Sequence, residues 1–238
     1  MAQEGVAAET LNLLCSVWDD RSHAADTSQI AANLTVALRQ MAANDEICKE
    51  LCDEGLLIIL SSILGETIVE PDNGNQKLCR TCLALYRQIL ASDYVKQSLD
   101  YEVFLDNIKH VLLFVVESDD SLDYGVLDAC LGAIAALCLR NPDTSERLVE
   151  KGVGTLILDS MNIVLNLIED FQSSHVPNGA SRALRQGCMA MRNIASRSPS
   201  VRQTLLDHGA VKTIQAAQKV SGRSCADVGD AAIRDLTA

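Results

Sequence analysis

Cysteine is the residue type in this chain whose spacing could do chemistry most directly. Cys79 and Cys82 form a C-x-x-C pair, and Cys48 and Cys52 stand one helical turn apart. A tetrahedral zinc site needs a second such pair or two suitably spaced histidines, and a thioredoxin-like site needs a surrounding βαβ pattern. The sequence shows neither. A thiol or zinc function at Cys79/Cys82 stays open as an alternative, but structural, buried cysteines are favoured, because a free thiol packs as a small apolar side chain.

Catalysis has little other support. The four histidines are scattered, and the sequence contains no H-E-x-x-H motif, no Cys/His arrangement and no glycine-rich phosphate loop. We therefore expect a protein that is not an enzyme, with no catalytic residue, no metal and no cofactor.

Cysteine usage and charge bear on compartment and partner. Nine cysteines spread through apolar patterns are typical of a reducing compartment, so we expect a cytoplasmic protein, with the nucleus as a second compartment that fits. The chain has 20 Lys and Arg against 32 Asp and Glu, a net charge of −12, which repels nucleic acid and anionic membranes. The first residues do not read as a leader, and no apolar run approaches the length of a membrane span. The expected partner is another protein or a peptide, and the expected state is a monomer.

The elements that must position any site are helices. Apolar letters make up 48% of the 238 residues and aromatics only 3%, and the apolar residues recur at three and four positions rather than alternating. Starts and stops predict helices near 5–18, 28–43, 45–53, 55–66, 74–91, 93–99, 101–117, 122–140, 142–150, 152–170, 179–197, 198–207, 209–220 and 224–237. Their lengths recur as short, medium, long.

Two series of similar segments recur at matching positions along these helices. Each series is called a ladder below, and each of its segments a rung. The first ends the long helices and consists of Arg39-Gln40-Met41, Arg87-Gln88-Ile89, Ala135-Ala136-Leu137, Arg192-Asn193-Ile194 and Arg234-Asp235-Leu236. The second ends short helices at a glycine and consists of Ile47-x3-Leu51-x3-Gly55, Leu148-x3-Gly152 and Val201-x3-Leu205-x3-Gly209. Glycine there suits a sharp turn into the next helix, because it tolerates positive φ. The second unit places Val103 at this point instead.

The segment Ala190-Met191-Arg192-Asn193-Ile194-Ala195, in a period of about 42 residues with three helices per unit, resembles the core of the armadillo repeat. The resemblance covers essentially the whole chain and implies an all-α fold, an armadillo-type right-handed superhelical solenoid of about five three-helix repeats. The units are expected at about 1–43, 44–91, 92–140, 141–197 and 198–238, as a single armadillo-repeat domain that is part of a longer protein.

The resemblance also implies a function. In peptide-binding armadillo families the Asn of this motif hydrogen-bonds the ligand backbone, so we expect a non-enzymatic interaction scaffold that binds a partner segment along a concave groove lined by the third helices. The expected groove residues are Arg39, Gln40, Arg87, Gln88, Arg192, Asn193, Arg234 and Asp235. Only one rung keeps Asn, which puts a uniform peptide track in doubt. The tryptophans of nuclear-import adaptors are replaced by Val36, Ala84, Gly132, Met189 and Ala231, so that function is not expected.

Two alternatives remain open at this stage. The arginine of each rung either contacts an acidic or phosphorylated ligand or pairs with an acidic residue of an adjacent unit. A long spacing in the fourth unit places about 15 extra residues in a long helix near 152–170 and a protruding loop, 171–179. That loop and the acidic surface could instead dock a folded partner.

Overall fold

The computed structural model describes residues 2–20, 24–67, 73–117, 122–170 and 176–238, and within these ranges it is helical, with no strand. The chain forms two compact units, Met1–Ile108 and Lys109–Ala238, whose boundary lies within α7. The elements are α1 (Ala2–Asp19), α2 (Ala24–Met41), α3 (Asp45–Asp53), α4 (Leu56–Thr67), α5 (Asn73–Ile89), α6 (Asp93–Ser98), α7 (Tyr101–Glu117), α8 (Tyr124–Cys138), α9 (Pro142–Glu150), α10 (Val153–Asp170), α11 (Asn178–Ala195), α12 (Pro199–Asp207), α13 (Ala210–Ser221), a 3₁₀ turn (Gly222–Ser224) and α14 (Ala226–Thr237).

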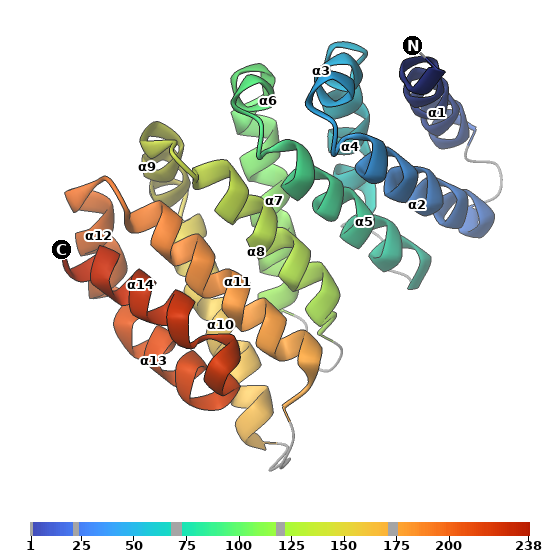
Figure 1. The fold of residues 1–238 in the computed structure, drawn as a ribbon. Helices are drawn as coiled ribbons and strands as arrows, with labels where there is room; N and C mark the ends of the chain where they lie inside the picture. The colour runs from blue at the N-terminus through green and yellow to red at the C-terminus, as the bar shows by residue number, and fades with distance from the viewer. Residues whose placement is uncertain (1, 21–23, 68–72, 118–121, 171–175) are drawn as a thin grey trace. The chain divides into compact units, whose positions relative to one another are not determined.

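Each expected helix is present, and the differences lie at the ends. The first two helices begin earlier than expected, at Ala2 and Ala24, because alanine is a strong helix former and extends a helix without a capping residue to mark its start. The last expected helix begins later than expected, at Ala226, because a 3₁₀ turn ends at Ser224. From α3 onward a short helix is followed by two longer ones in each repeat (Figure 1). The expected short, medium, long order holds only for α3–α5, because α7 has 17 residues and α8 has 15, α10 and α11 both have 18, and α13 and α14 both have 12.

The short helices α3, α9 and α12 begin at side-chain caps, whereas the Ser92 side chain before α6 forms no capping hydrogen bond. Asn44 accepts hydrogen bonds from the backbone N–H groups of Glu46 and Ile47, at 3.0 and 3.1 Å. Asn141 and Ser198 cap α9 and α12 in the same way, each followed by a proline at the start of the helix. Such caps satisfy N–H groups that have no partner inside the helix. Sequence signals of this kind mark where the repeats that start at α3, α9 and α12 begin.

The glycine ladder has the backbone conformation that the sequence predicts. Gly55, Gly152 and Gly209 have φ values of +99°, +79° and +79°, in the left-handed region that disfavours other residues. The second repeat, which contains α6 and α7, makes this turn without glycine. Leu99 is extended there, and the carboxylate of Asp100 accepts hydrogen bonds from the N–H groups of Glu102 and Val103 at 3.1 and 3.2 Å.

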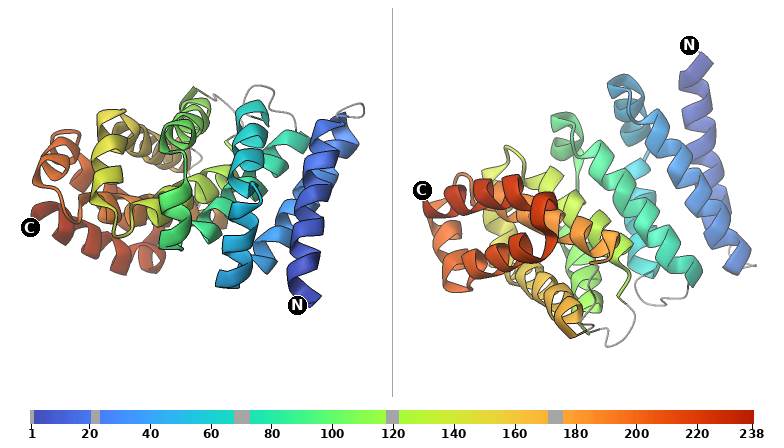
Figure 2. Two further views of the ribbon diagram at one scale, coloured as in Figure 1. Left: turned by 90° about the horizontal axis from the view of Figure 1, so that it is seen from above. Right: turned by 60° about the horizontal axis from the view of Figure 1, so that its bottom comes forward.

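In the first unit, α2 packs along α5, and α1 packs along α2 (Figures 1 and 2). The side chains of Tyr86 and Phe104 are fully buried, with ring centroids 4.8 Å apart. Trp18 is buried, and its indole N–H donates to the Ser62 hydroxyl at 3.3 Å, which joins α1 to α4. The unit therefore has a continuous apolar core behind its third helices.

In the second unit, the long helices α8, α11 and α14 pack side by side, and α10 and α13 pack behind α11 (Figure 2). Leu137, Met191 and Leu236 are buried among them. Gly187 lets α11 approach α10 closely, since a Cβ there would overlap the side chain of Met161. The contacts run between neighbouring helices of successive repeats, as in a solenoid.

The extra length of the fourth repeat lies partly where the sequence places it. Helix α10 has 18 residues, against 12 in both α4 and α13 but 17 in α7. Residues 171–175 of the expected 171–179 loop lie outside the described residues. Asn178 and Gly179 already belong to α11, so that loop ends earlier than expected. Among the described helices, no single one is long and apolar enough to cross a membrane. The pair α9 and α10, bent by 74°, reaches that threshold by length and composition only.

Candidate functional site

In the first unit, two exposed side-chain amides lie at equivalent positions of the repeat, Gln40 on α2 and Gln88 on α5. Gln40 and Gln88 are exposed near the ends of these helices, while the adjacent Leu38 and Ile89 are fully buried and so fix which way the polar residues point. Within the described part of the chain, neither amide forms a hydrogen bond. Each can therefore offer a donor and an acceptor to a ligand backbone.

The arginines of these two rungs are also free of acidic partners. Arg87 is exposed and Arg39 is half-buried, and neither forms an ion pair with any residue that the structure describes. Helix α5 carries Lys77, Arg80 and Arg87 and no acidic residue. In a chain of net charge −12, this helix presents a locally basic surface.

Polar contacts that the sequence analysis missed hold α2 and α5 in register. The Thr35 hydroxyl donates to that of Thr81 at 2.8 Å, and the Ser28 hydroxyl donates to the Asn75 side chain at 2.9 Å. The Lys77 ammonium donates to the side-chain oxygen Oε1 of Gln29 at 3.0 Å. Small hydroxyl residues at helical spacing within apolar segments were the available signal. These contacts fix how far α2 and α5 are shifted along each other, and therefore where Gln40 lies relative to Gln88.

In the second unit, the Asn193 rung is tied to a neighbouring helix. Asn193 is half-buried, and its amide nitrogen donates to the backbone carbonyl of Ala135 at 2.7 Å. The donor expected to bind a ligand is therefore used within the array, and the side-chain oxygen is left as an acceptor. Ala136, the apolar rung of the same ladder, is half-buried on α8 beside this contact.

The last two segments of the ladder are joined by an ion pair between α11 and α14. Arg192 Nε lies 3.2 Å from Asp235 Oδ2, with the side chains 45% and 34% exposed. Of the two alternatives for the ladder arginines, the structure shows for Arg192 a pairing with an acidic residue of the adjacent repeat. Arg234 is exposed and has no ionic partner among the described residues.

Basic residues also gather on α11. This helix carries Arg182, Arg185 and Arg192 and no acidic residue. The flanking long helices differ, since α8 has only the acidic Asp128 and α14 has more acidic than basic residues. Two of the long helices, α5 and α11, are therefore basic in an acidic protein, which the sequence analysis did not note because it treated charge over the whole chain.

The C-x-x-C pair lies in the core of the first unit. Cys79 and Cys82 are both buried, and burial, followed by the proximity of Cys79, raises the pKa of the Cys82 thiol well above its usual value. A protonated thiol is a poor nucleophile and a poor metal ligand. In the described residues, no group of three or more His, Cys, Asp or Glu side chains could hold a metal ion.

A second thiol pair, which the sequence analysis did not single out, joins α11 to the segment before α14. A hydrogen bond between Cys188 and Cys225 lowers the pKa of Cys225 to about 7 and raises that of Cys188. Both thiols are fully buried. The Cys225 thiol donates to the backbone carbonyl of Ser181 at 3.9 Å, so both thiols make contacts inside the core of the second unit.

The sequence matches no protein-family model and no curated protein. Solved structures do match. A designed armadillo repeat protein, YIII(Dq)4CqI, superposes with a TM-score of 0.69 at 19% identity, covering 98% of this chain and 82% of that one. A second design, YIII(Dq.V1)4CPAF in complex with peptide (KR)4, gives 0.69 at 18% identity, with the same coverage of 98% and 82%.

A third match is to computationally designed armadillo repeat proteins for modular peptide recognition, with a TM-score of 0.66 at 19% identity over 97% of this chain and 82% of that one. These identities are low, so the likeness establishes the fold alone. Together with the three-helix repeats and the glycine turns, it shows that the chain is an all-α, armadillo-type solenoid.

Proposed function

We propose that the chain is a non-enzymatic scaffold that binds an extended segment of another protein on its third helices. The observation that carries the proposal is the pair of exposed amides, Gln40 and Gln88, in equivalent positions on two packed helices and without partners in the described residues. Exposed amides that recur in phase suit recognition of a peptide backbone, which offers one donor and one acceptor per residue. The similarity to designs made for peptide recognition supports this function.

The charges favour an acidic segment. Arg39 and Arg87 lie next to the free amides and lack acidic partners in the described part of the chain, and Lys77 and Arg80 belong to the same helix as Arg87. A guanidinium group pairs with carboxylate or phosphate through two parallel hydrogen bonds. The ligand we propose therefore carries carboxylates or phosphates beside an extended backbone.

The second unit makes a smaller contribution in this proposal. Asn193 and Asp235 are engaged by Ala135 and Arg192, so binding there requires either the remaining acceptor of Asn193 or opening of the ion pair. An exposed ion pair is worth only about 0–1 kcal/mol, so a ligand carboxylate could replace Asp235. Arg192 and Arg234 are then secondary contacts for the same acidic segment.

The test is fluorescence anisotropy with a labelled twelve-residue Glu-Ser repeat peptide and, for comparison, a Lys-Arg repeat peptide. We expect saturable binding of the acidic peptide and little binding of the basic one. The double variant Gln40→Ala/Gln88→Ala should weaken binding by about tenfold, since it removes two hydrogen-bonding groups worth about 0.5–1.5 kcal/mol each. Its melting temperature should not change, because both side chains are exposed.

Arg87→Ala and Arg223→Ala form a matched pair, since both arginines are exposed and only Arg87 lies on a third helix. Arg87→Ala should weaken the acidic peptide, and Arg223→Ala should not. Equal effects of the two variants, or binding that the glutamine variant leaves unchanged, would count against recognition by the third helices.

A narrower relationship forms part of this proposal. Segments 134–143, 186–194 and 225–236 resemble the C-terminal part of armadillo-repeat-containing protein six. The resemblance names no partner, so the ligand chemistry rests on the exposed side chains of the third helices.

A further inference from the structure

A chain of polar contacts joins α5 to α2 on the surface of the first unit. The Lys77 ammonium donates to Oε1 of Gln29 at 3.0 Å, and Nε2 of Gln29 donates to Oδ1 of Asn33 at 2.9 Å. A lysine ammonium can only donate, so it must meet the oxygen of the Gln29 amide. The Gln29 nitrogen is then left to face Asn33, which must accept through its own oxygen. The direction of both hydrogen bonds is therefore fixed by the lysine.

The groups that this chain leaves unused are hydrogen-bond donors. Asn33 is exposed, and its amide nitrogen has no partner among the residues that the structure describes. The half-buried Lys77 uses one of its N–H groups on Gln29 and has two more. A peptide backbone needs donors and acceptors in equal number, whereas an anion needs donors alone. This part of the third-helix surface therefore suits an anion.

The register of α2 and α5 places a second cation level with Asn33. Three side-chain hydrogen bonds between the two helices join residues that are 46, 47 and 48 positions apart in sequence. An offset in this range puts Arg80 opposite Asn33. Arg80 is exposed and has no ionic partner in the described part of the chain. Because these bonds hold the helices against sliding, Asn33, Lys77 and Arg80 keep their relative heights.

The carboxylates of α2 and α5 do not compete for these donors. Helix α5 has no acidic residue, and the only one in α2 is Asp26, in its first turn. Asn33 follows Asp26 by about two helical turns, or roughly 10 Å, which is comparable with the screening length of about 8–10 Å in physiological salt. The positive charges of Lys77 and Arg80 therefore prevail at Asn33.

The second unit has the same basic positions but lacks the amides. Helices α5 and α11 carry basic residues at the same three places of the repeat, namely Lys77, Arg80 and Arg87 in α5 and Arg182, Arg185 and Arg192 in α11. In α8, the helix that packs on α11, Gly125 and Ala129 occupy the places that Gln29 and Asn33 occupy in α2. Neutral donors beside a basic triad are therefore a feature of α2 and α5 and not of α8 and α11.

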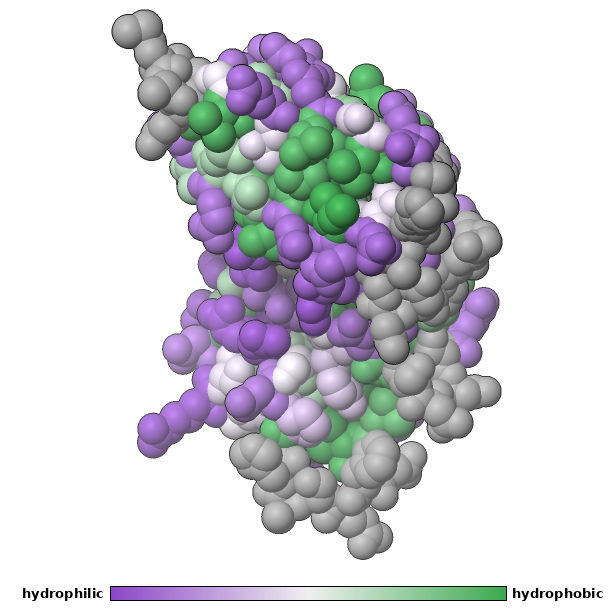
Figure 3. Space-filling model, turned by 90° about the vertical axis from the view of Figure 1, so that its right-hand side faces the viewer, coloured by the Kyte–Doolittle hydropathy of each residue, from purple (hydrophilic) through white to green (hydrophobic). Residues whose placement is uncertain are grey.

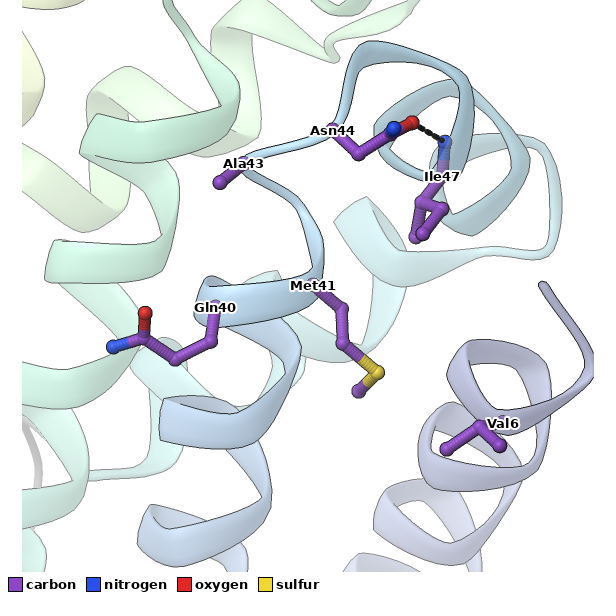
Figure 4. Close-up of a pocket in the computed structure, with 6 residues that line it drawn as sticks. All are labelled: Val6, Gln40, Met41, Ala43, Asn44 and Ile47. Carbon is purple, nitrogen blue, oxygen red and sulfur yellow. Dashed lines mark hydrogen bonds between the residues drawn. The ribbon is translucent and has the colours of Figure 1, made fainter. Parts of the chain in front are cut away.

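A hollow on the first unit does not suit an anion. It has a volume of about 560 Å³, lies where α1, α2 and α3 meet, and is lined by Val6, Met41 and Ile47 among others. Figure 3 shows hydrophobic surface among polar side chains on the face where α1 lies, and in Figure 4 the Gln40 side chain extends away from Val6 and Met41. Apolar side chains cannot compensate the loss of an anion's hydration. The donors between α2 and α5 are therefore the better anion site.

We propose that Asn33, Lys77 and Arg80 hold the phosphate of a phosphorylated serine or threonine in the bound segment. A phosphate monoester carries a charge of about −1.5 to −2 and three acceptor oxygens, one for each of these donor groups, whereas a glutamate side chain has one charge and two oxygens. Asn33 precedes Gln40 on α2 by about 10 Å, a distance that an extended peptide spans in about three residues. The inference rests on the proposed function, because the phosphate belongs to the segment that Gln40 and Gln88 bind.

The probe is a pair of fluorescein-labelled peptides based on the twelve-residue Glu-Ser repeat. One central serine is replaced by phosphoserine in the first peptide and by glutamate in the second, so the two differ at a single side chain. In fluorescence anisotropy the phosphoserine peptide should bind about tenfold more tightly than the glutamate peptide, since hydrogen bonds to a more highly charged group are stronger. This ratio of dissociation constants is the phosphate preference.

Asn33→Ala is the decisive protein variant, because it removes donors without changing charge. It should reduce the phosphate preference by about threefold and leave binding of the glutamate peptide within about twofold of the parent protein. The double variant Asn33→Ala/Lys77→Ala should remove the preference. Gln97→Ala and Lys109→Ala are the matched controls, since an exposed amide on α6 and a half-buried lysine on α7 lie away from the third helices. Both should keep the preference, and circular dichroism melts should show that all four variants are folded.

The outcomes separate this site from the proposed function. If both peptides bind equally well, or if Asn33→Ala and Gln97→Ala leave the same preference, the phosphate site is wrong while recognition of an acidic segment by Gln40 and Gln88 stands. If neither peptide binds, the proposed function fails and the phosphate site fails with it.

Discussion

At the scale of single residues, several polar side chains form hydrogen bonds within the protein, and their partners could not be predicted from the sequence. Asn193 is the clearest case, since its motif predicts a ligand contact and its amide instead donates to the backbone carbonyl of Ala135. The motif lies at the end of the long helix α11. The partner lies 58 residues away in sequence, in a repeat whose own rung is alanine, and only packing of α8 on α11 brings the two together.

This contact predicts that Asn193→Ala lowers stability. The variant removes a half-buried hydrogen bond and leaves the Ala135 carbonyl without that donor, which should cost about 1–2 kcal/mol. Urea unfolding measures the loss. Gln88→Ala is the matched control, because that amide is exposed and unbonded in the described residues, and it should stay within about 0.5 kcal/mol of the parent protein. Equal stability of the two variants would contradict the role assigned to Asn193.

Tyr86 gives a prediction about pH. Its hydroxyl donates to the Leu57 carbonyl at 3.3 Å and meets the Ser61 hydroxyl at 2.9 Å, and burial raises its pKa well above the model-compound value of 10.0. A raised pKa means that the unfolded chain loses this proton first. The stabilisation is therefore fully present below pH 10 and is lost as the pH rises beyond it.

Tyr86→Phe should therefore reduce stability by about 1–2 kcal/mol at pH 7 and by less at pH 11. Unfolding curves at both pH values measure the difference. Tyr94→Phe is the comparison, because Tyr94 also has a raised pKa but is exposed and bonded to Asp53. A Tyr86→Phe deficit that grows with pH would show that the sign is wrong.

At the scale of elements, sequence reasoning was most successful where one residue type dictates the backbone. Gly55, Gly152 and Gly209 all have positive φ, and the caps Asn44, Asn141 and Ser198 stand immediately before short helices. These are local effects. The expected ends of helices were less accurate where no cap or glycine marks them, as at Ala24, and residues that only packing brings together, such as Thr35 and Thr81, were not predicted at all.

The glycine turns predict opposite effects for two Gly→Ala variants. Gly209→Ala should destabilise by about 1–2 kcal/mol, because φ is +79° there and an L side chain is strained in that region. Gly65→Ala should stabilise by about 0.5–1 kcal/mol, since Gly65 lies within α4 and an added Cβ would sit 3.7 Å from Asn107 Oδ1. Chemical denaturation of both variants provides the check, and a loss of the same size in each would remove the turn argument.

At the scale of the whole molecule, the repeat pattern in the sequence was enough for the fold, because each unit repeats the same local signals. Net charge was a poorer guide. The value of −12 conceals basic helices α5 and α11, and those helices supply the case for an acidic ligand.

The solenoid itself predicts how damage spreads. Leu137 is fully buried, so Leu137→Asp introduces an unpaired buried charge and should cost at least about 3 kcal/mol. In a repeat array stability is close to a sum of each unit and its neighbouring interfaces. Hydrogen exchange should therefore show lost protection in α8, α11 and α14, while α1 to α3 keep theirs. Ala136→Asp, at the adjacent half-buried position, should change exchange much less. Uniform loss of protection along the whole chain in the Leu137 variant would mean that the protein unfolds as a single cooperative globule rather than as a stack of repeats.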